Sequence, residues 1–217
     1  MAGAHRIAGV DSDHAGGVWI AYQEVTSSDH AIVHVDPSGA TLSTWTYTGD
    51  PSEVSGIAVD EDAVWVNHNS IGSIGTDRIT KLDLRTGAEL QTFATQGQIS
   101  DLEIQWGELL LSSYQNQVIG LDRTTGGQVS WMPTQVVRTT QTGIAAYGDH
   151  LFVSSWNMDT LTLVDHDGTI LGTATSPVLH TSQTAAVGRF LANDGPNKLI
   201  LATESQIAWL DDAHGVM

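Results

Sequence analysis

The chain has 217 residues, with 25 acidic against eight basic side chains and a formal net charge of −17. Such a surface repels phosphate backbones, which excludes nucleic-acid binding, and the lack of cysteine excludes thiol nucleophiles and cysteine-based zinc sites. No apolar run approaches the roughly 20 residues of a membrane-spanning helix, and the amino terminus lacks the basic and apolar segments of a secretion signal.

Short apolar segments bounded by Gly, Asp or Asn follow one another along the chain, and the second repeat shows their order most plainly. There we expect strands at 56–60, 63–67, 78–83 and 89–93, rich in β-branched and aromatic residues. Matching first strands are predicted at 7–10, 102–104, 143–146 and 185–187. The second strands carry a large residue at one repeated place, which we expect to pack repeat against repeat: Trp19, Trp65, Leu110, Phe152 and Ile200.

A turn that starts with Asp and ends with Gly closes the third strand of every repeat. The five copies span 36–39, 83–87, 122–126, 165–168 and 211–215. Asp can accept hydrogen bonds from its own following backbone, and Gly supplies the positive φ that ends such a turn. We therefore interpret these turns as connections between third and fourth strands, and not as calcium loops.

A period in the forties with four short strands per unit is typical of a β-propeller, in which each repeat is one blade. We predict an all-β fold, a single small β-propeller of five blades over 1–217, with blades near 5–49, 54–95, 98–134, 140–176 and 182–217. The fifth blade is expected to lack its outer strand. Its exposed edge would then be a docking edge for another chain, formed by Gln206, Ile207, Ala208, Trp209 and Leu210.

Loops after the second strands, together with those between blades, open on one face of a propeller, and we place the candidate ligand site there. Aromatic rings with amide partners suit a sugar or a protein surface. The candidates are Tyr22, Asn67, His68, Asn69, Tyr114, Gln115, Trp156 and Asn157. The alternative interpretation is that they are strand-end residues without a ligand.

The nine histidines do not make a metal site in this pattern. His30 and His34 lie on one strand about 13 Å apart, and only His68 and His180 could meet across the candidate face. We therefore predict no metal, no cofactor and no catalytic residue.

The segments 56–60, 64–66, 79–83 and 86–87 resemble those of the NHL-type and quinoprotein-like propellers over nearly the whole chain. That superfamily includes streptogramin lyases, with a His/Glu cluster and magnesium, and gluconolactonase-like hydrolases, with Glu, Asn and Asp around a divalent metal. Both have more blades than this chain can form, and neither ligand set can be matched to residues here.

The function predicted from these features is a non-enzymatic binding or structural module. We expect a surface, tail or capsid-associated component of a virion that contacts other protein subunits, and a cell-surface glycan or receptor, without nucleic acid or membrane insertion. The first alternative is a metal-dependent lyase or lactonase that uses the candidate face. The second is a cytoplasmic scaffold propeller.

Overall fold

The computed structural model of the chain describes residues 5–13, 15–24, 29–47, 52–70, 77–95, 99–113, 117–133, 141–155, 158–175, 190–193, 198–202 and 207–211. All regular secondary structure in these ranges is β-strand. None of the described segments forms a helix long and apolar enough to cross a membrane. The prediction of an all-β fold is confirmed.

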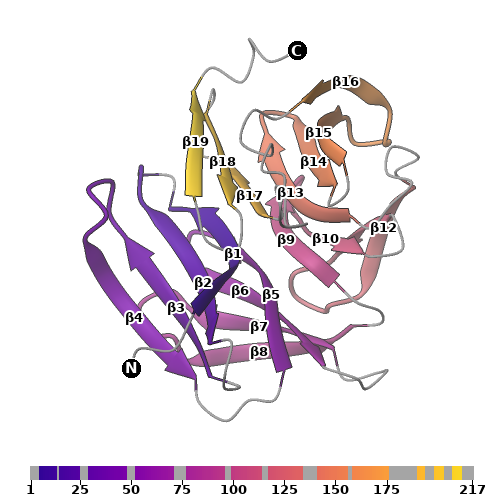
Figure 1. The fold of residues 1–217 in the computed structure, drawn as a ribbon. Coiled ribbons are helices and arrows are strands. Elements are labelled where there is room, and N and C mark those ends of the chain that lie inside the picture. The colour runs from indigo at the N-terminus through magenta and orange to yellow at the C-terminus, as the bar shows by residue number, and fades with distance from the viewer. Residues whose placement is uncertain are drawn as a thin grey trace.

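Four consecutive four-stranded sheets form the blades of a propeller-like ring (Figure 1). Neighbouring strands pair antiparallel, and each blade follows the chain from its inner to its outer strand. Blade 1 is β1 (His5–Ser12), β2 (Val18–Glu24), β3 (His30–Val35) and β4 (Thr41–Tyr47). Blade 2 is β5 (Ser52–Val59), β6 (Ala63–Ser70), β7 (Arg78–Asp83) and β8 (Glu89–Ala94). Blade 3 is β9 (Ile99–Gln105), β10 (Glu108–Ser113), β11 (Gln117–Leu121) and β12 (Gln128–Pro133). Blade 4 is β13 (Gln141–Tyr147), β14 (His150–Ser155), β15 (Met158–Val164) and β16 (Ile170–Thr175).

A three-stranded sheet follows blade 4, formed by β17 (Phe190–Asn193), β18 (Lys198–Ala202) and β19 (Ile207–Asp211). Its first strand, β17, contacts β13 on one side and β1 on the other. The inner strand predicted at 185–187 lies outside the described residues, and the first described strand of this sheet is β17, which pairs with β18. Gln206 and the turn residues 212–215 also lie outside the described residues, so the missing outer strand stays a prediction.

The inner strands approach one another closely around the axis. A Cβ on Gly9 would lie 2.9 Å from the backbone nitrogen of Ile57, and a Cβ on Gly56 would lie 2.7 Å from the Cα of Asp101. Both distances are shorter than any ordinary contact, so only glycine fits at these two places. Each of the four inner strands also has a register shift at this level, which bends it round the axis.

The core lies between the blades, as the column of large second-strand residues predicts. Trp19 and Trp65 are 3% and 0% exposed, and Leu110 and Phe152 are each 2% exposed. Trp19 packs against Val54 and Val64 of blade 2, in a cluster that both blades build. The side chain of Ile200 lies outside the described part of the chain.

The Asp-to-Gly turns connect third and fourth strands in blades 1 to 4, as predicted. In the second turn, Asp83 Oδ1 accepts from the backbone nitrogen and Oγ1 of Thr86, at 2.8 and 2.7 Å. Gly87 has a φ of 69°, and a Cβ there would lie 2.6 Å from the ring of Trp45 in the preceding blade. This glycine therefore serves both the turn and the packing of one blade on the next.

Candidate functional site

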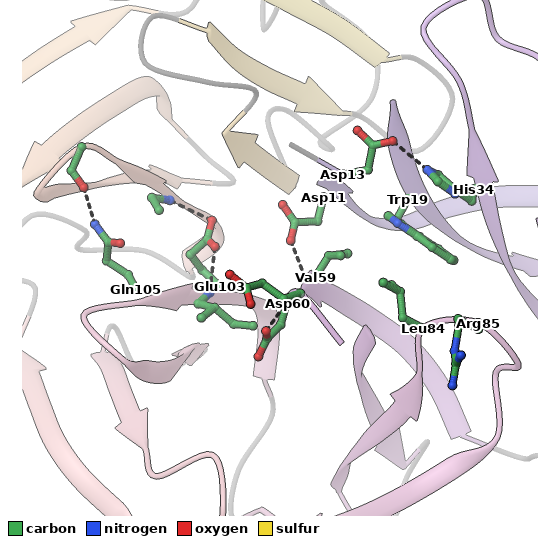
Figure 2. Close-up of a pocket in the computed structure, with 14 residues that line it drawn as sticks. Asp11, Asp13, Trp19, His34, Val59, Asp60, Leu84, Arg85, Glu103 and Gln105 are labelled. Carbon is green, nitrogen blue, oxygen red and sulfur yellow. Dashed lines mark hydrogen bonds and ion pairs between the residues drawn. The ribbon is translucent and has the colours of Figure 1, made fainter. Parts of the chain in front are cut away.

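A cavity of about 1020 Å³ opens at the axis, on the face that carries the turns between first and second strands. The inner strands of all four blades line it, through Asp11, Val59, Glu103 and Ala146. In Figure 2 the lining side chains surround a common open space, with Trp19, His34 and Asp13 grouped on one side. Five carboxylates line it, against one guanidinium, that of Arg85: Asp11, Asp13, Asp60, Glu61 and Glu103.

Asp11 and Glu103 occupy the same position in two blades, because each pairs with the large second-strand residue of its own blade. Both tie their blade to the next. Asp11 Oδ2 accepts from the backbone nitrogen of Val59 at 2.6 Å, and Glu103 Oε2 accepts from that of Ala146 at 2.8 Å. Blades 2 and 4 carry Ala58 and Ala145 at this position. The acids therefore alternate with alanines around the four blades.

A third buried acid, Asp101, lies on β9 two residues before Glu103 and does not line the cavity. Its Oδ2 accepts from the backbone nitrogen of Ile144 at 3.1 Å, and its Oδ1 accepts from that of Leu102 at 3.0 Å. Asp101 stands where the other three blades have glycine. Blade 3 thus holds blade 4 through two carboxylates.

Burial dominates the electrostatics of these acids. It raises the pKa of Glu103 to about 7, although the backbone groups of Ala146 and Ile104 hydrogen-bond to the charged form. It also raises the pKa of Asp11 well above its usual range, and the negative charge of Glu103 adds to that effect. The pKa of Asp101 is raised well above its usual range by burial too. The site therefore holds carboxyl groups that can exchange protons near neutral pH.

A hydrogen-bonded pair of His34 and Asp13, together with the ring of Trp19, forms one wall of the cavity. His34 Nε2 lies 2.8 Å from Asp13 Oδ2, and its ring stacks on Trp19 with centroids 4.3 Å apart. Burial alone would raise the pKa of Asp13, but the hydrogen bonds from His34 and from the backbone of Ala15 and Gly17 outweigh it and lower the pKa.

Blade 2 repeats this arrangement with other residues. Lys81 faces Trp65 in the same register as His34 faces Trp19. Its Nζ lies 5.2 Å from the ring centroid of Trp65 and 3.7 Å from Asp62 Oδ1. The unit of acid, base and Trp thus occurs in blades 1 and 2, and in blade 1 it also lines the cavity.

Two further acidic residues, Asp60 and Glu61, line the cavity. Asp60 forms an ion pair with Arg123, which projects from the third-to-fourth strand turn of blade 3. Glu61, the next residue, is exposed and lines the cavity beside it. Asp13 and Asp60 are thus paired with basic side chains, and burial favours the protonated forms of Asp11 and Glu103. Glu61 is the exposed acid of the lining.

The predicted site residues of blade 2 do not lie in this cavity, and all three of them make contacts between blades. Asn67 Nδ2 donates to Ser55 Oγ of its own blade at 2.5 Å and to the carbonyl oxygen of Ile99 in blade 3 at 3.3 Å. Asn69 Nδ2 donates to the same carbonyl oxygen at 2.7 Å. His68 is buried, with its ring centroid 5.3 Å from that of His30. These contacts join the blades.

Tyr22 lies in blade 1 and is half-buried beside the cluster of Ile7 and Ile20. Burial raises the pKa of its hydroxyl. Four more of the predicted site residues lie outside the described part of the chain: Tyr114, Gln115, Trp156 and Asn157. A ligand site on the face predicted from the sequence therefore stays a prediction.

Sequence reasoning missed Asp11 and Glu103, although a signal was present. Each acid interrupts a short apolar inner strand, which is an unusual place for a carboxylate. Within the described residues, no group of three His, Cys, Asp or Glu side chains could hold a metal ion.

No family model matches the chain, and a search of curated proteins finds no match. Solved structures do resemble it. A glutaminyl cyclase of Myxococcus xanthus aligns with a TM-score of 0.73 at 12% identity, over 94% of this chain and 91% of that one. The β-propeller domain of Myceliophteria thermophila Cps50 (Swd1) aligns with a TM-score of 0.55 at 13% identity, over 94% of this chain and 65% of that one. A chain of a mitotic checkpoint complex aligns with a TM-score of 0.58 at 17% identity, over 96% and 63%.

At these identities the similarity establishes the β-propeller architecture. The narrower resemblance to NHL-type and quinoprotein-like propellers stays a prediction.

Proposed function

We propose that the chain is a binding module whose axial cavity receives a positively charged group of a peptide or protein partner. The observation that carries this proposal is the lining of the 1020 Å³ cavity, in which five acidic side chains face one guanidinium. A cation bound there would favour the charged forms of Asp11 and Glu103, whose pKa values burial raises. A concave site with one sign of charge and low-dielectric walls concentrates ligands of the opposite sign.

The same proposal includes a ring closed by the three-stranded sheet as a fifth blade. Its support is the position of β17, which contacts both β13 and β1. In this arrangement β19 is the last described strand of the sheet, and its edge is the proposed docking edge for a neighbouring subunit.

The biological setting that we propose is a non-enzymatic component of a larger assembly, such as a virion surface or tail. A propeller is a rigid frame that holds a ligand site on one face and a docking edge on its rim. The solved structures that resemble this chain include one from a multi-protein complex, the mitotic checkpoint complex. A cytoplasmic scaffold is the other setting of the same kind.

Calorimetric titration with tetralysine, with tetraglutamate as the anionic probe, tests the cavity. We expect tetralysine to bind, and its affinity to fall as salt is added. Glu61→Gln should weaken binding by up to about fivefold, the scale of one exposed charge pair. Asp62→Asn is the matched control, since Asp62 lies in the same turn and is exposed but does not line the cavity. Equal binding of tetraglutamate, or an equal loss with Asp62→Asn, would contradict the proposal.

A second candidate function is cyclisation of a peptide amino terminus, and a specific observation favours it. The chain matches the glutaminyl cyclase over almost the full length of both proteins, and Glu103, with a pKa of about 7, lines the axial cavity. In such a reaction the terminal amino nitrogen attacks the side-chain amide carbon, a ring C–N bond forms, and ammonia leaves. Glu103 would take the proton from the attacking amine and return it to the leaving ammonia.

Mass spectrometry of a peptide with an amino-terminal glutamine tests this second function. Loss of ammonia at a rate above the protein-free control, and its disappearance in Glu103→Gln, would support the enzyme. Tetralysine binding without any acceleration of ammonia loss would favour the binding module.

A further inference from the structure

Blades 1, 2 and 3 differ in the side chains that their second, third and fourth strands place against the next blade, and in blade 3 these side chains leave part of the space empty. In blade 1 the second, third and fourth strands contribute Trp19, Ile32 and Trp45, and in blade 2 the equivalent residues are Trp65, Ile79 and Phe93. The rings of Trp65 and Phe93 stack with centroids 5.9 Å apart. These rings occupy the space between blades 2 and 3.

In blade 3 all three equivalent residues are smaller: Leu110, Val118 and Met132. A second cavity, of about 310 Å³, opens beside them between blades 3 and 4. Leu110, Val118 and Met132 line it and are 2%, 1% and 6% exposed. The cavity thus lies where two aromatic rings stand at the preceding interface.

Two aromatic side chains from neighbouring turns complete the walls. Trp106, in the β9–β10 turn, and His166, in the β15–β16 turn, meet edge to face with centroids 4.6 Å apart. The indole Nε1 of Trp106 also donates to the carbonyl oxygen of Asp149 at 3.2 Å. The ring of Trp106 is therefore held in place from blade 4.

Trp106 has a φ of 52°, and it is the one described residue other than glycine with a positive φ. A two-residue hairpin turn of this kind favours Asn, Asp or Gly at that position, and a bulky residue there is strained. Strain of this sort persists where the surrounding structure fixes it, and it gathers at ligand sites. The turn thus keeps a large aromatic ring at the mouth of the cavity at a conformational cost.

We propose that the cavity between blades 3 and 4 is a binding site for a small aromatic ligand that carries a protonated amine. The ring would take the space that Trp65 and Phe93 fill at the neighbouring interface. The amine would face Asp167, whose carboxylate lines the exposed mouth beside His166. An engineered cavity of about 150 Å³ is enough to bind benzene, so a space of 310 Å³ accommodates a two-ring system such as indole.

Titration with indole, tryptamine and indole-3-acetate tests this site, followed by protein NMR or calorimetry. We expect tryptamine to bind more tightly than indole, and indole-3-acetate to bind least tightly. Asp167→Asn should reduce the preference for tryptamine over indole by up to about fivefold. Met132→Phe separates this site from the acid-lined axial cavity, because Met132 does not line that cavity and the variant should leave tetralysine binding unchanged.

Met132→Phe places an aromatic ring in blade 3 where blade 2 has Phe93. It should weaken indole binding at least tenfold, with a melting temperature equal to or above that of the wild type. Val129→Phe is the matched control, since Val129 lies on the same strand but is 56% exposed; it should bind indole as the wild type does. Should Met132→Phe not fold, Trp106→Asn removes the aromatic wall and suits the turn, and it should weaken indole binding as well. Absence of indole binding at millimolar concentration, or unchanged binding in both Met132→Phe and Trp106→Asn, would overturn the proposal.

Discussion

Replacing Glu103 with Gln should make the stability of the protein less dependent on pH. In the unfolded chain this carboxyl loses its proton near pH 4.5, whereas burial in the folded protein raises its pKa to about 7. Between these values the folded state binds more protons than the unfolded state, so stability falls as the pH rises. The penalty is absent below about pH 4.5 and complete above about pH 7.

The difference between 4.5 and about 7 corresponds to about 3 kcal/mol. Asp11 and Asp101, whose pKa values are also raised, add to the loss in the same direction. Glu103→Gln removes the contribution of Glu103, and it also lowers the pKa of Asp11, because the charge of Glu103 contributes to raising it. The variant loses one backbone hydrogen bond, so its absolute stability falls while its pH dependence flattens.

Urea unfolding followed by tryptophan fluorescence, in steps from pH 4.5 to 8, measures this effect. The turn aspartates Asp36, Asp83 and Asp122 have lowered pKa values, so their contribution is lost only below this range. Glu61→Gln is the exposed control on the same cavity. Parallel stability curves for the wild type and Glu103→Gln would refute the reasoning.

Three further changes test the packing and the charge of the ring. Gly87→Ala should lower the melting temperature more than Gly39→Ala. Both glycines have a positive φ, which costs about 1–2 kcal/mol for another residue. A Cβ at Gly87 would also clash with the ring of Trp45, whereas a Cβ at Gly39 would have no neighbour within 4 Å. Asn69→Ala should lower the free energy of unfolding in urea by about 1 kcal/mol, because the hydrogen bond to Ile99 is lost. It should leave tetralysine affinity unchanged; a loss of affinity would indicate that the ligand binds at the face predicted from the sequence. Arg123→Met frees Asp60 from its ion pair and should strengthen tetralysine binding by up to about fivefold in calorimetry; weaker binding would mean that the cavity does not act through its negative charge.

The architecture could be predicted from the sequence because its signals are local and repeat. The strand predicted at 78–83 coincides with β7, because this short segment contains β-branched residues and ends at an Asp-to-Gly turn. The column of Trp19, Trp65, Leu110 and Phe152 is buried for the same reason, because one place in each repeat meets the next blade. Repetition turns a weak local signal into a strong one.

The site could not be predicted in this way, because it depends on differences between repeats. Asp11 and Glu103 line one cavity only because the ring brings the same place in blades 1 and 3 to one axis. Asn67 and Asn69 have a composition typical of a ligand site, but their partners, Ser55 and Ile99, come from a neighbouring strand and the next blade. The sequence carries no local sign of either contact.

A crystal structure of the protein with bound tetralysine tests the central claim most directly. Our account predicts an ammonium group in the axial cavity, within hydrogen-bonding distance of Glu61 or of the carboxylates of Asp11 and Glu103. Peptide bound instead at the opposite face, beside Tyr22 or His68, with the axial cavity free of peptide, would contradict it.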